Sequence, residues 1–340
     1  MAAGLAGETT VTLALDVEGG DAAPIEPIVG ALGAASPRLQ VLLVGRPEII
    51  QPHLVDTDTR YVEIVPSATI ISSSDEPAMA VRSKTDSSIV VGARSVADGR
   101  AQGFVSAGST GAMLAASLLV VKRIRGVKRP AIVTVLPGLS GPVVFLDAGA
   151  NANCRPEHLL EFGVLGSIFA RLTLGIEAPR VGLLNIGEEA TKGSDLALQA
   201  HALLAESGLR FVGNVEGRDL LFNLADVVVT DGFTGNVGLK LLEGTAQALL
   251  TRLRDAAGRD TRSKFGGLLL RPALREMRAS LDPEEYGGTY LLGVRGLVVI
   301  CHGNSSRRAI TNALLFGAEA VRRRVVESVE NELGRDEATG

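Results

Sequence analysis

Residues 230–238 read TDGFTGNVG and directly follow the apolar run Ala225–Val229, which is typical of a buried strand. Three glycines alternate there with Asp231, Thr234 and Asn236, where the strand turns into a predicted helix. Glycine allows close backbone approach, and a helix N-terminus presents N–H groups and a partial positive charge. The segment therefore has the parts of an anion site, although an ordinary helix cap would use the same residues.

Five further predicted strand ends carry similar glycine-rich polar segments. They are LDVEGGDAAP (15–24), SAGSTGA (106–112), LDAGANANC (146–154), LNIGEEATKGS (184–194) and CHGNSSRR (301–308). Ligands of doubly wound sheets bind beyond the carboxyl ends of the strands, so we expect all six segments to form one rim of N–H donors. Tight helix–strand packing would explain the glycines but not the repeated Asp, Asn and Lys, which favours a site for a phosphate-like anion.

Strands and helices that alternate along the chain must position these segments. The predicted strands are Val11–Asp16, Leu39–Val44, Phe104–Ser106, Ala131–Leu136, Val143–Asp147, Val181–Asn185, Ala225–Thr230 and Val298–Cys301. The predicted helices are Pro24–Ala35, Asp86–Asp98, Thr110–Ile124, Pro156–Leu174, Ser194–Ser207, Asn236–Arg254 and Ser305–Leu333. This alternation predicts an α/β fold with a doubly wound, mostly parallel sheet. We expect one catalytic domain over 11–333, a flexible N-terminus at 1–10 and a frayed tail at 334–340.

Composition excludes several classes of protein. The 340 residues carry a net charge of −4, which gives no electrostatic case for nucleic-acid binding. Two cysteines make no disulfide framework, and four scattered histidines make no zinc site. The N-terminus lacks the pattern of a secretory signal, and the apolar stretch Gly111–Val121 is too short to span a bilayer, so a cytoplasmic location is expected. No G-x-G-x-x-G follows a strand, residues 187–194 lack the Walker order, and there is no G-x-S-x-G elbow.

The motifs resemble, in order and over almost the whole chain, those of the phosphate acyltransferase family PlsX. The matching segments are Asp16–Pro24, Glu76–Ser88, Ser106–Ala112, Asp147–Asn151, Asn185–Gly193, Asp231–Lys240, Tyr286–Gly296 and His302–Gly303. Three residues depart from the usual pattern: Glu18 stands in place of Met, Ser109 in place of Asn, and Asn153 in place of Asp. Ser109 can still cap a helix, whereas Glu18 adds a negative charge near the expected anion site.

The resemblance implies transfer of a fatty acyl group from acyl carrier protein to inorganic phosphate. The acyl phosphate product would feed the first acylation of glycerol 3-phosphate, which makes a glycerol-3-phosphate acyltransferase a possible downstream partner. It further implies a homodimer and a fold similar to phosphate acetyltransferases and isocitrate-type dehydrogenases. The reaction needs no cofactor and no metal.

Phosphate is already anionic at neutral pH, so the enzyme has to position it beside the thioester and stabilise the tetrahedral oxyanion. The candidate catalytic residues are Lys192, to neutralise phosphate or oxyanion, Asn236, as an amide donor, and His302, as a donor to the leaving thiolate. Asp16 and Asp21 are expected to hold their loop rather than to touch phosphate. The full set expected around phosphate is Asp16, Gly19, Gly20, Asp21, Gly108, Ser109, Thr110, Asn151, Gly187, Glu188, Asp231, Gly232, Thr234 and Gly235.

Three alternatives stay open from the residues alone. A covalent route would use Cys154 or Cys301, although Cys301 and His302 point to opposite faces of a strand. An NAD-dependent oxidoreductase of related fold would need nicotinamide and clustered carboxylates for a metal. A non-catalytic membrane scaffold for lipid-synthesis enzymes would make the rim dispensable.

Two segments indicate contacts with larger partners. Residues 121–129 (VKRIRGVKR) and the stretch 252–278, which holds eight Arg or Lys and three acids, are candidate docking surfaces for an acidic carrier protein. In 265–281 we expect Pro272 to open a helix with Ala273, Leu274, Met277 and Leu281 on one face. Phe265 and Leu268–Leu270 would form an apolar tip ringed by arginines, suited to an anionic membrane surface, within a helical arm at 252–282 that also forms the dimer.

Overall fold

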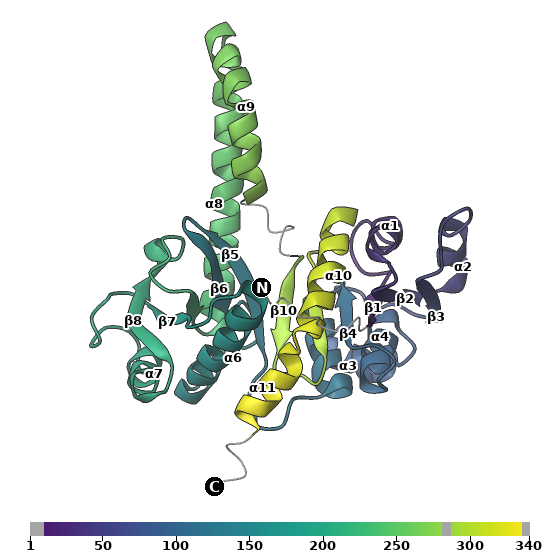
Figure 1. Ribbon diagram of the computed structural model, residues 1–340, viewed down its shortest axis with the longest axis horizontal. Coiled ribbons are helices and arrows are strands. Elements are labelled where there is room, and N and C mark those ends of the chain that lie inside the picture. The colour runs from purple at the N-terminus through teal and green to yellow at the C-terminus, as the bar shows by residue number, and fades with distance from the viewer. Residues whose placement is uncertain (1–9, 281–286, 335–340) are drawn as a thin grey trace, which may run out of the picture.

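The computed structural model describes residues 10–280 and 287–334 of the chain (Figure 1), so the expected termini lie almost wholly outside these residues. Within them, an eleven-stranded sheet has the order β3-β2-β1-β4-β11-β10-β5-β6-β9-β7-β8. The strands are β1 Val11–Asp16, β2 Leu39–Gly45, β3 Val62–Pro66, β4 Gly103–Ser106, β5 Ala131–Gly138, β6 Gly141–Leu146, β7 Arg180–Asn185, β8 Arg210–Glu216, β9 Val227–Val229, β10 Thr289–Leu292 and β11 Leu297–Ile300.

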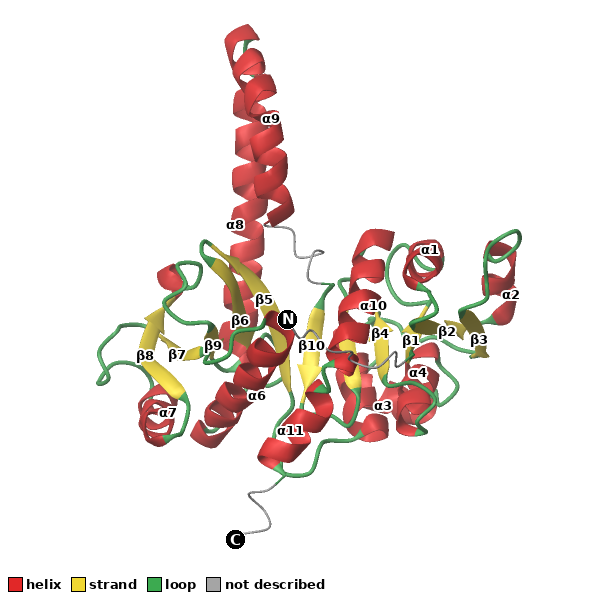
Figure 2. Cartoon of the chain, viewed as in Figure 1, coloured by secondary structure: helices red, strands yellow, loops and turns green. Residues whose placement is uncertain are grey.

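Helices cover both faces of this sheet, which confirms the predicted α/β fold (Figure 2). One face packs against α1 Ile25–Ala34, α6 Pro156–Leu174, α7 Asp195–Glu206, α10 Arg307–Arg322 and α11 Val325–Leu333, which share one hydrophobic core. The other face packs against α3 Pro77–Ser83, α4 Ser88–Ala97, α5 Thr110–Ala116 and the first half of α8 Gly232–Gly258. The short helix α2 Pro47–Ile50 follows β2.

The strands do not all run in the same direction. Strands β1, β2, β3, β4 and β11 are parallel, and β6, β7, β8 and β9 are parallel among themselves. Between these two sets, β10 is antiparallel to β11 and β5, and β5 is antiparallel to β6. The two sets therefore run in opposite directions, and their carboxyl ends lie at opposite edges of the sheet. The expectation of one rim formed by all six strand ends is wrong for this reason.

The reversal comes from a tight β5–β6 hairpin. Gly138 pairs with Gly141, so only Leu139 and Ser140 form the turn. Gly141 has φ 142°, a conformation that glycine adopts without strain. The prediction treated the two strands as separate buried parallel strands, because their β-branched composition is the same in both arrangements.

Several helix boundaries also differ from those predicted. The expected helix Ser305–Leu333 is divided into α10 and α11 by Arg324, whose φ is 57°. The predicted helix Thr110–Ile124 is shorter in the structure, where α5 is followed by a short π-helix over Ser117–Val121. The helix propensity of the residues in these segments did not predict either interruption.

A long helical hairpin extends from the body as an arm (Figure 1). Helix α8 has 27 residues, and α9 Thr261–Ser280 returns along it. Pro272 lies inside α9 rather than at the start of a helix, so the expected helix boundary is wrong. Phe265 and Leu268–Leu270 lie on α9, not in a loop, and are 58–67% exposed. The expected face at Leu281 lies outside the described residues.

Candidate active site

At one edge of the sheet, the loops after β1, β4 and β11 meet around Asp16. The Asp16 carboxylate is buried and accepts hydrogen bonds from Glu18 N (3.0 Å) and Ser106 Oγ (2.8 Å), while Gly108 N donates to the same Ser106 Oγ. Burial raises the pKa of Asp16, and the hydrogen bonds from Ser106 and Ser88 oppose this effect. Asp16 therefore organises the loops, as expected, although it accepts from Glu18 rather than from a glycine.

Glycines let these loops approach each other closely. A Cβ on Gly19 would lie 2.6 Å from Asp16 Oδ2 and 2.7 Å from Gly108 N, so a side chain there would displace the backbone of the β4 loop. Gly20 has φ 97° and Asp21 N donates to Gly303 O (2.6 Å), which joins the β1 loop to the β11 loop beside His302. The exposed Asp21 and the half-buried Gly108 thus share one edge with His302.

Ser109 and Thr110 lie at the same edge. Ser109 is the N-cap of α5, where its Oγ accepts from Ala112 N at 3.5 Å, so this departure from the family pattern keeps a capping role. Thr110 is the exposed first residue of α5.

Glu18 is paired with Arg46, which follows the neighbouring parallel strand β2 at the same edge of the sheet. Its carboxylate accepts from Arg46 Nε (2.7 Å) and Arg46 N (3.2 Å), and the Glu18 side chain is only 4% exposed. The extra negative charge is therefore neutralised by the start of α2, and it does not repel an anion at Gly19–Asp21.

The opposite edge is organised by a second buried carboxylate, Asp147. It accepts from Ile132 N, Gly149 N, Ala150 N and Asn151 N at 2.7–3.1 Å, and also from Asn151 Nδ2. Asn151 Nδ2 donates in addition to Pro130 O at 2.8 Å, which commits both amide protons. Asn151, expected near phosphate, thus holds the β6 loop in this structure.

The TDGFTGNVG turn is a closed helix cap. Gly232 N donates to Asn151 O, Phe233 N and Thr234 N donate to Asp231 Oδ1, and Gly235 N donates to Asp231 O. Thr234 Oγ1 donates to Asp231 Oδ2 at 2.7 Å. The bond from Gly235 N is the first regular bond of the helix, and the N–H groups of the three residues before it are all occupied, so an anion could use these three groups only by displacing Asp231 or Asn151.

The glycines of this turn serve packing. A Cβ on Gly235 would lie 1.9 Å from Asp147 O, and one on Gly232 would lie 2.7 Å from Asp147 Oδ2. Helix α8 consequently begins in close contact with the Asp147 loop.

Lys192 follows β7 at this second edge, because β7 is parallel to β9, which leads into Asp231. Its loop is closed by a hydrogen bond from Asn185 Nδ2 to Lys192 O (2.9 Å), and its side chain and that of Glu188 are exposed. A Cβ on Gly187 would lie 3.3 Å from Lys192 Cγ. Lys192 and His302, expected on one rim, thus belong to opposite edges.

Helix α8 links the two edges. Asn236, Lys240 and Glu243 share one face at positions i, i+4 and i+7. Asn236 lies at the β6 loop, because a Cβ added to Gly149 would be 3.6 Å from Asn236 Oδ1. Glu243 Oε1 lies 3.8 Å from His302 Nε2, and Lys240 Nζ lies 2.8 Å from Glu243 Oε2.

Sequence reasoning missed Lys240 and Glu243 as candidate site residues. Lys240 ends the family motif Asp231–Lys240, and Glu243 follows at i+3 on the same helix. The i, i+3 spacing of Lys240 and Glu243 could have indicated that these two side chains contact each other. Their proximity to His302 follows only from the tertiary structure.

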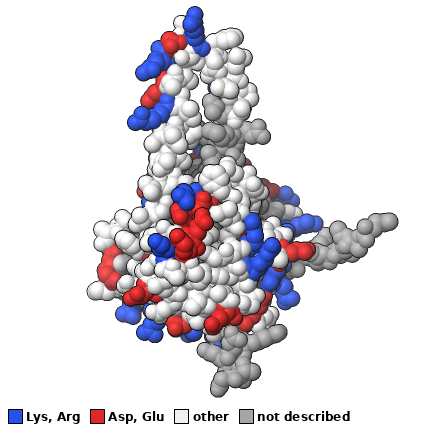
Figure 3. Space-filling view, turned by 90° about the vertical axis from the view of Figure 1, so that its left-hand side faces the viewer, with Lys and Arg blue, Asp and Glu red and all other residues white. Residues whose placement is uncertain are grey.

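A mainly apolar cavity of about 530 Å³ opens beside Glu243 and His302. It lies between β5 and α8, and its walls include Val135, Leu136, Leu242, Ala246, Leu249 and Leu250. No charged residue occurs on α8 between Glu243 and Arg252. On the face seen in Figure 3, charged side chains gather toward the far end of the arm, and the stretch nearer the body is largely uncharged.

The basic segment 121–129 surrounds two further cavities. One, of about 530 Å³, has Lys122, Arg123, Arg125 and Arg295 in its wall. The other, of about 480 Å³, brings Arg123, Lys128 and Arg129 next to Asn151. The cations of this segment are thus gathered around concave surface close to the β6 loop.

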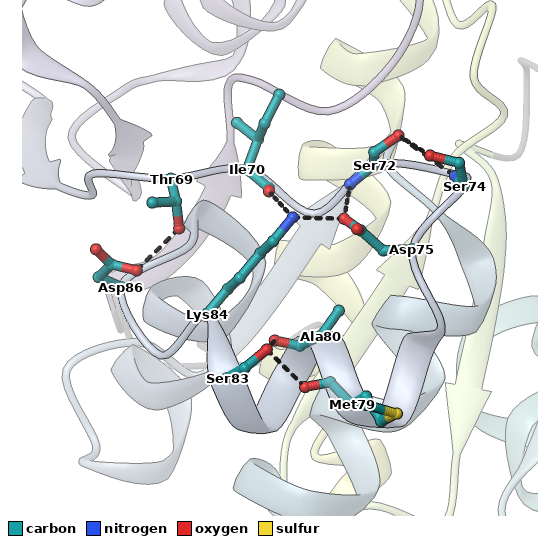
Figure 4. A network of polar contacts seen from close by, with 10 residues as sticks. All are labelled: Thr69, Ile70, Ser72, Ser74, Asp75, Met79, Ala80, Ser83, Lys84 and Asp86. Carbon is teal, nitrogen blue, oxygen red and sulfur yellow. Dashed lines mark hydrogen bonds and ion pairs between the residues drawn. The ribbon is translucent and has the colours of Figure 1, made fainter.

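The motif Glu76–Ser88 supports the first edge structurally (Figure 4). Glu76 caps α3 by accepting from Ala78 N and Met79 N. Figure 4 shows Lys84 Nζ, which donates to Ile70 O (3.2 Å) and Asp75 Oδ2 (2.6 Å). The hydrogen bond from Lys84 lowers the pKa of Asp75. Pro77, at the start of α3, lies against Gly111 of α5, so this network positions the helix that follows Gly108.

The surroundings of the two cysteines bear on the covalent route. Burial raises the pKa of Cys154 to about 11, and its Sγ lies 3.5 Å from Asn151 O. Cys301 is buried, with Sγ 3.7 Å from Gly287 O. A thiol nucleophile needs a lowered pKa, so the geometry does not favour the covalent route.

Two further properties concern the part of the chain that is described. None of its helices is both long and apolar enough to cross a membrane. Nor do its His, Cys, Asp and Glu side chains come together in groups of three or more that could hold a metal ion.

Solved structures with a similar fold are phosphotransacetylases. A phosphotransacetylase from Streptococcus pyogenes superposes with a TM-score of 0.62 at 15% identity, over 92% of this chain and 94% of the other. The EutD phosphotransacetylase from Staphylococcus aureus superposes with a TM-score of 0.59 at 18% identity, over 91% and 94% of the two chains. The chain therefore has a phosphotransacetylase-like α/β fold, as expected.

Sequence relatives define the family. A phosphate acyltransferase from Heliobacterium modesticaldum is 49% identical over 94% of this chain and 97% of its own length. A phosphate acyltransferase from Pelotomaculum thermopropionicum is 46% identical over 96% of each chain. The model of the "Fatty acid synthesis protein" family matches residues 11–328. The chain belongs to this family and is an acyltransferase, which confirms the resemblance recognised in its motifs.

Proposed function

We propose that this protein transfers a fatty acyl group from acyl carrier protein to inorganic phosphate. The observation that carries the proposal is the position of His302, Glu243 and Lys240 where an apolar cavity opens. Acyl phosphate has an anionic head and an apolar chain, and this place offers polar groups and apolar surface side by side. The names of the relatives support phosphate as the acyl acceptor.

The reaction is a direct displacement. A phosphate oxygen attacks the thioester carbonyl carbon, the carbon–sulfur bond breaks, and the products are acyl phosphate and the carrier thiol. The proton carried by hydrogen phosphate passes to the sulfur, and His302 is the group placed to relay it. Phosphate is anionic at neutral pH, as phosphorylated side chains are, so the nucleophile already exists there and the enzyme has mainly to position it.

Lys192 and Asn236 are proposed to stabilise phosphate or the tetrahedral oxyanion. Asn236 fits this role because it lies on the same α8 face as Lys240 and Glu243. Lys192 belongs to the second edge of the sheet and has an exposed side chain, so phosphate held by Lys192 has to lie along the α8 face between Asn236 and Glu243 to reach a thioester at His302. Neither role requires a cofactor or a metal.

The arm is proposed to form a homodimer and to rest on an anionic membrane surface. Its support is the row of exposed apolar side chains Leu249, Leu253, Phe265 and Leu268–Leu270, because so large an apolar surface is unusual on a monomer. Arg252, Arg254 and Arg262 on the same hairpin suit anionic headgroups. A glycerol-3-phosphate acyltransferase is the proposed consumer of the product.

The deciding experiment mixes purified protein, acyl carrier protein charged with a fatty acid, and phosphate. We expect acyl phosphate and free carrier thiol in equal amounts, and no release of thiol without phosphate. Replacing both Cys154 and Cys301 by Ser should leave this turnover largely intact. Thiol release that continues without phosphate, or turnover abolished in the double variant, would contradict direct transfer.

A further inference from the structure

The cavity beside His302 has one polar region and a long apolar body. His302 and Glu243 supply the polar groups, where α8 passes the end of β11. From there, the α8 wall continues through Ala246, Leu249 and Leu250 to Leu253, opposite Val135 and Leu136 of β5. A water-filled apolar cavity is unfavourable, so its shape indicates an apolar ligand with one polar end.

The dimensions suit a medium or long alkyl chain. The ten helical steps from Glu243 to Leu253 rise about 15 Å. An extended polypeptide backbone advances about 1.2 Å per bond, and an extended alkyl chain has a similar rise. The length of this wall therefore matches an alkyl chain of about twelve carbons. Leu249 and Leu253 are 57% and 47% exposed, so the far end of the cavity is open to solvent.

We infer that this cavity binds the acyl chain, with the reacting carbonyl at His302, and that Ala246 sets the chain length the cavity accepts. The inference rests on the proposed reaction for the identity of the polar head, but the alkyl site itself is a separate property. Ala246 is half-buried in the middle of the α8 wall, and its small side chain leaves the lumen open. A larger side chain there would block passage from His302 toward Leu253.

The observations favour an alkyl chain over a second copy of the arm. An arm from another copy would bring its own backbone and side chains, which are about 10 Å across, whereas the cavity holds about 530 Å³. Polar groups gathered at one place, with apolar walls beyond them, match a single amphiphilic molecule.

The test uses n-alkylphosphonates of four, eight and twelve carbons as stable stand-ins for acyl phosphate. Binding to the full chain is measured by calorimetry for the wild type, for Ala246→Phe and for Ala248→Phe. Ala248 is an exposed alanine two positions further along the same helix, outside the cavity wall, and is therefore a matched control. Sedimentation of each variant reports its oligomeric state.

We expect wild-type affinity to rise by up to about fourfold per methylene until the wall is filled. Ala246→Phe should weaken dodecylphosphonate at least tenfold and leave butylphosphonate unchanged, whereas Ala248→Phe should behave as wild type. Equal dodecylphosphonate affinity in all three proteins overturns the inference. The inference is also overturned if Ala246→Phe changes the oligomeric state but not the affinity for dodecylphosphonate, because the occupant of the cavity is then a second copy of the chain.

Turnover separates this inference from the proposed reaction. If the wild-type protein binds the alkyl series as expected but forms no acyl phosphate, the inferred alkyl site stands and the proposed reaction is refuted. If the protein forms acyl phosphate but has the same KM for butyryl and dodecanoyl carrier protein, the proposed reaction stands and the inferred alkyl site is refuted.

Discussion

His302 Nε2 lies 3.8 Å from Glu243 Oε1, which joins the end of strand β11 to the side of helix α8. His302 follows β11 and Glu243 lies on the helix that follows β9, so they are carried by strands of the two oppositely directed sets. Glu243 also contacts Lys240 Nζ at 2.8 Å, so a carboxylate lies between a permanent cation and an imidazole. This arrangement can orient the imidazole and stabilise it when it is protonated.

We expect His302→Ala to lower kcat for acyl transfer by about a hundredfold, the lower range for loss of a positioned acid or base. Glu243→Gln should lower kcat less, by about tenfold, because it acts through the imidazole. The two effects should be non-additive in the double variant, since contacting residues act together. His53→Ala, after α2, is the control; additive losses would argue against the pairing.

Lys192→Ala and Asn236→Ala should each cut turnover without unfolding the protein. Loss of one positioned donor costs on the order of 3 kcal/mol in comparable oxyanion sites, or about a hundredfold in kcat. Arg100→Ala, which removes an exposed cation paired with Glu63 away from both sites, is the control for loss of a positive charge, and circular dichroism checks the fold. Near-normal rates in both variants would refute their assignment.

Phosphate or sulfate soaked into a crystal should bind near Lys192 and the Gly232–Asn236 turn. Because the first-turn N–H groups of α8 are occupied, we expect the anion to contact the Asn236 side chain unless Asp231 rotates away. Density confined to remote surface arginines would count against this site.

Arg125→Glu combined with Arg295→Glu should raise the KM for acyl carrier protein at least tenfold, because both side chains surround the basic cavity near 121–129. The KM for a short acyl-pantetheine thioester should not change, since it lacks the acidic carrier surface. The effect should shrink as salt rises. Arg262→Glu tests whether the arm contributes instead; salt-insensitive binding would exclude electrostatic docking.

Leu268→Glu together with Leu270→Glu should release the protein from anionic vesicles at low salt. Both side chains are about 60% exposed, so charge there opposes membrane contact without opening the core. Acyl transfer in solution should be unchanged. A double variant that loses its dimer and its activity would show that the segment is an interface, and the membrane claim would fail.

Arg46→Met should destabilise the fold by about 2 kcal/mol, because it leaves the Glu18 carboxylate nearly buried and without its guanidinium partner. Glu18→Met added to Arg46→Met should recover much of that loss. Urea unfolding of the four proteins gives the coupling. A loss in the double variant equal to the sum of the losses in Arg46→Met and Glu18→Met alone would show that the pair contributes nothing.

The sequence alone determined the family, the α/β class and most strands, because buried β-branched runs and ordered glycine-rich motifs are local features. β1 Val11–Asp16 agrees with its prediction at both ends. The edge strands β3 and β8 and the short β10 were missed, since their patterns are weak or lie beside loops. The loop-holding role of Asp16 and the capping role of Ser109 could be predicted for the same reason, because both follow from local features of the sequence.

Only the tertiary structure decided which motifs meet. The two-residue turn at Leu139–Ser140 reverses half of the sheet, and it separates Lys192 from His302 although their motifs look alike. The same fold carries α8 from the Asp147 loop to the end of β11, where Glu243 reaches His302. Strand direction and helix path depend on contacts between distant segments, which residue patterns along the chain do not encode locally.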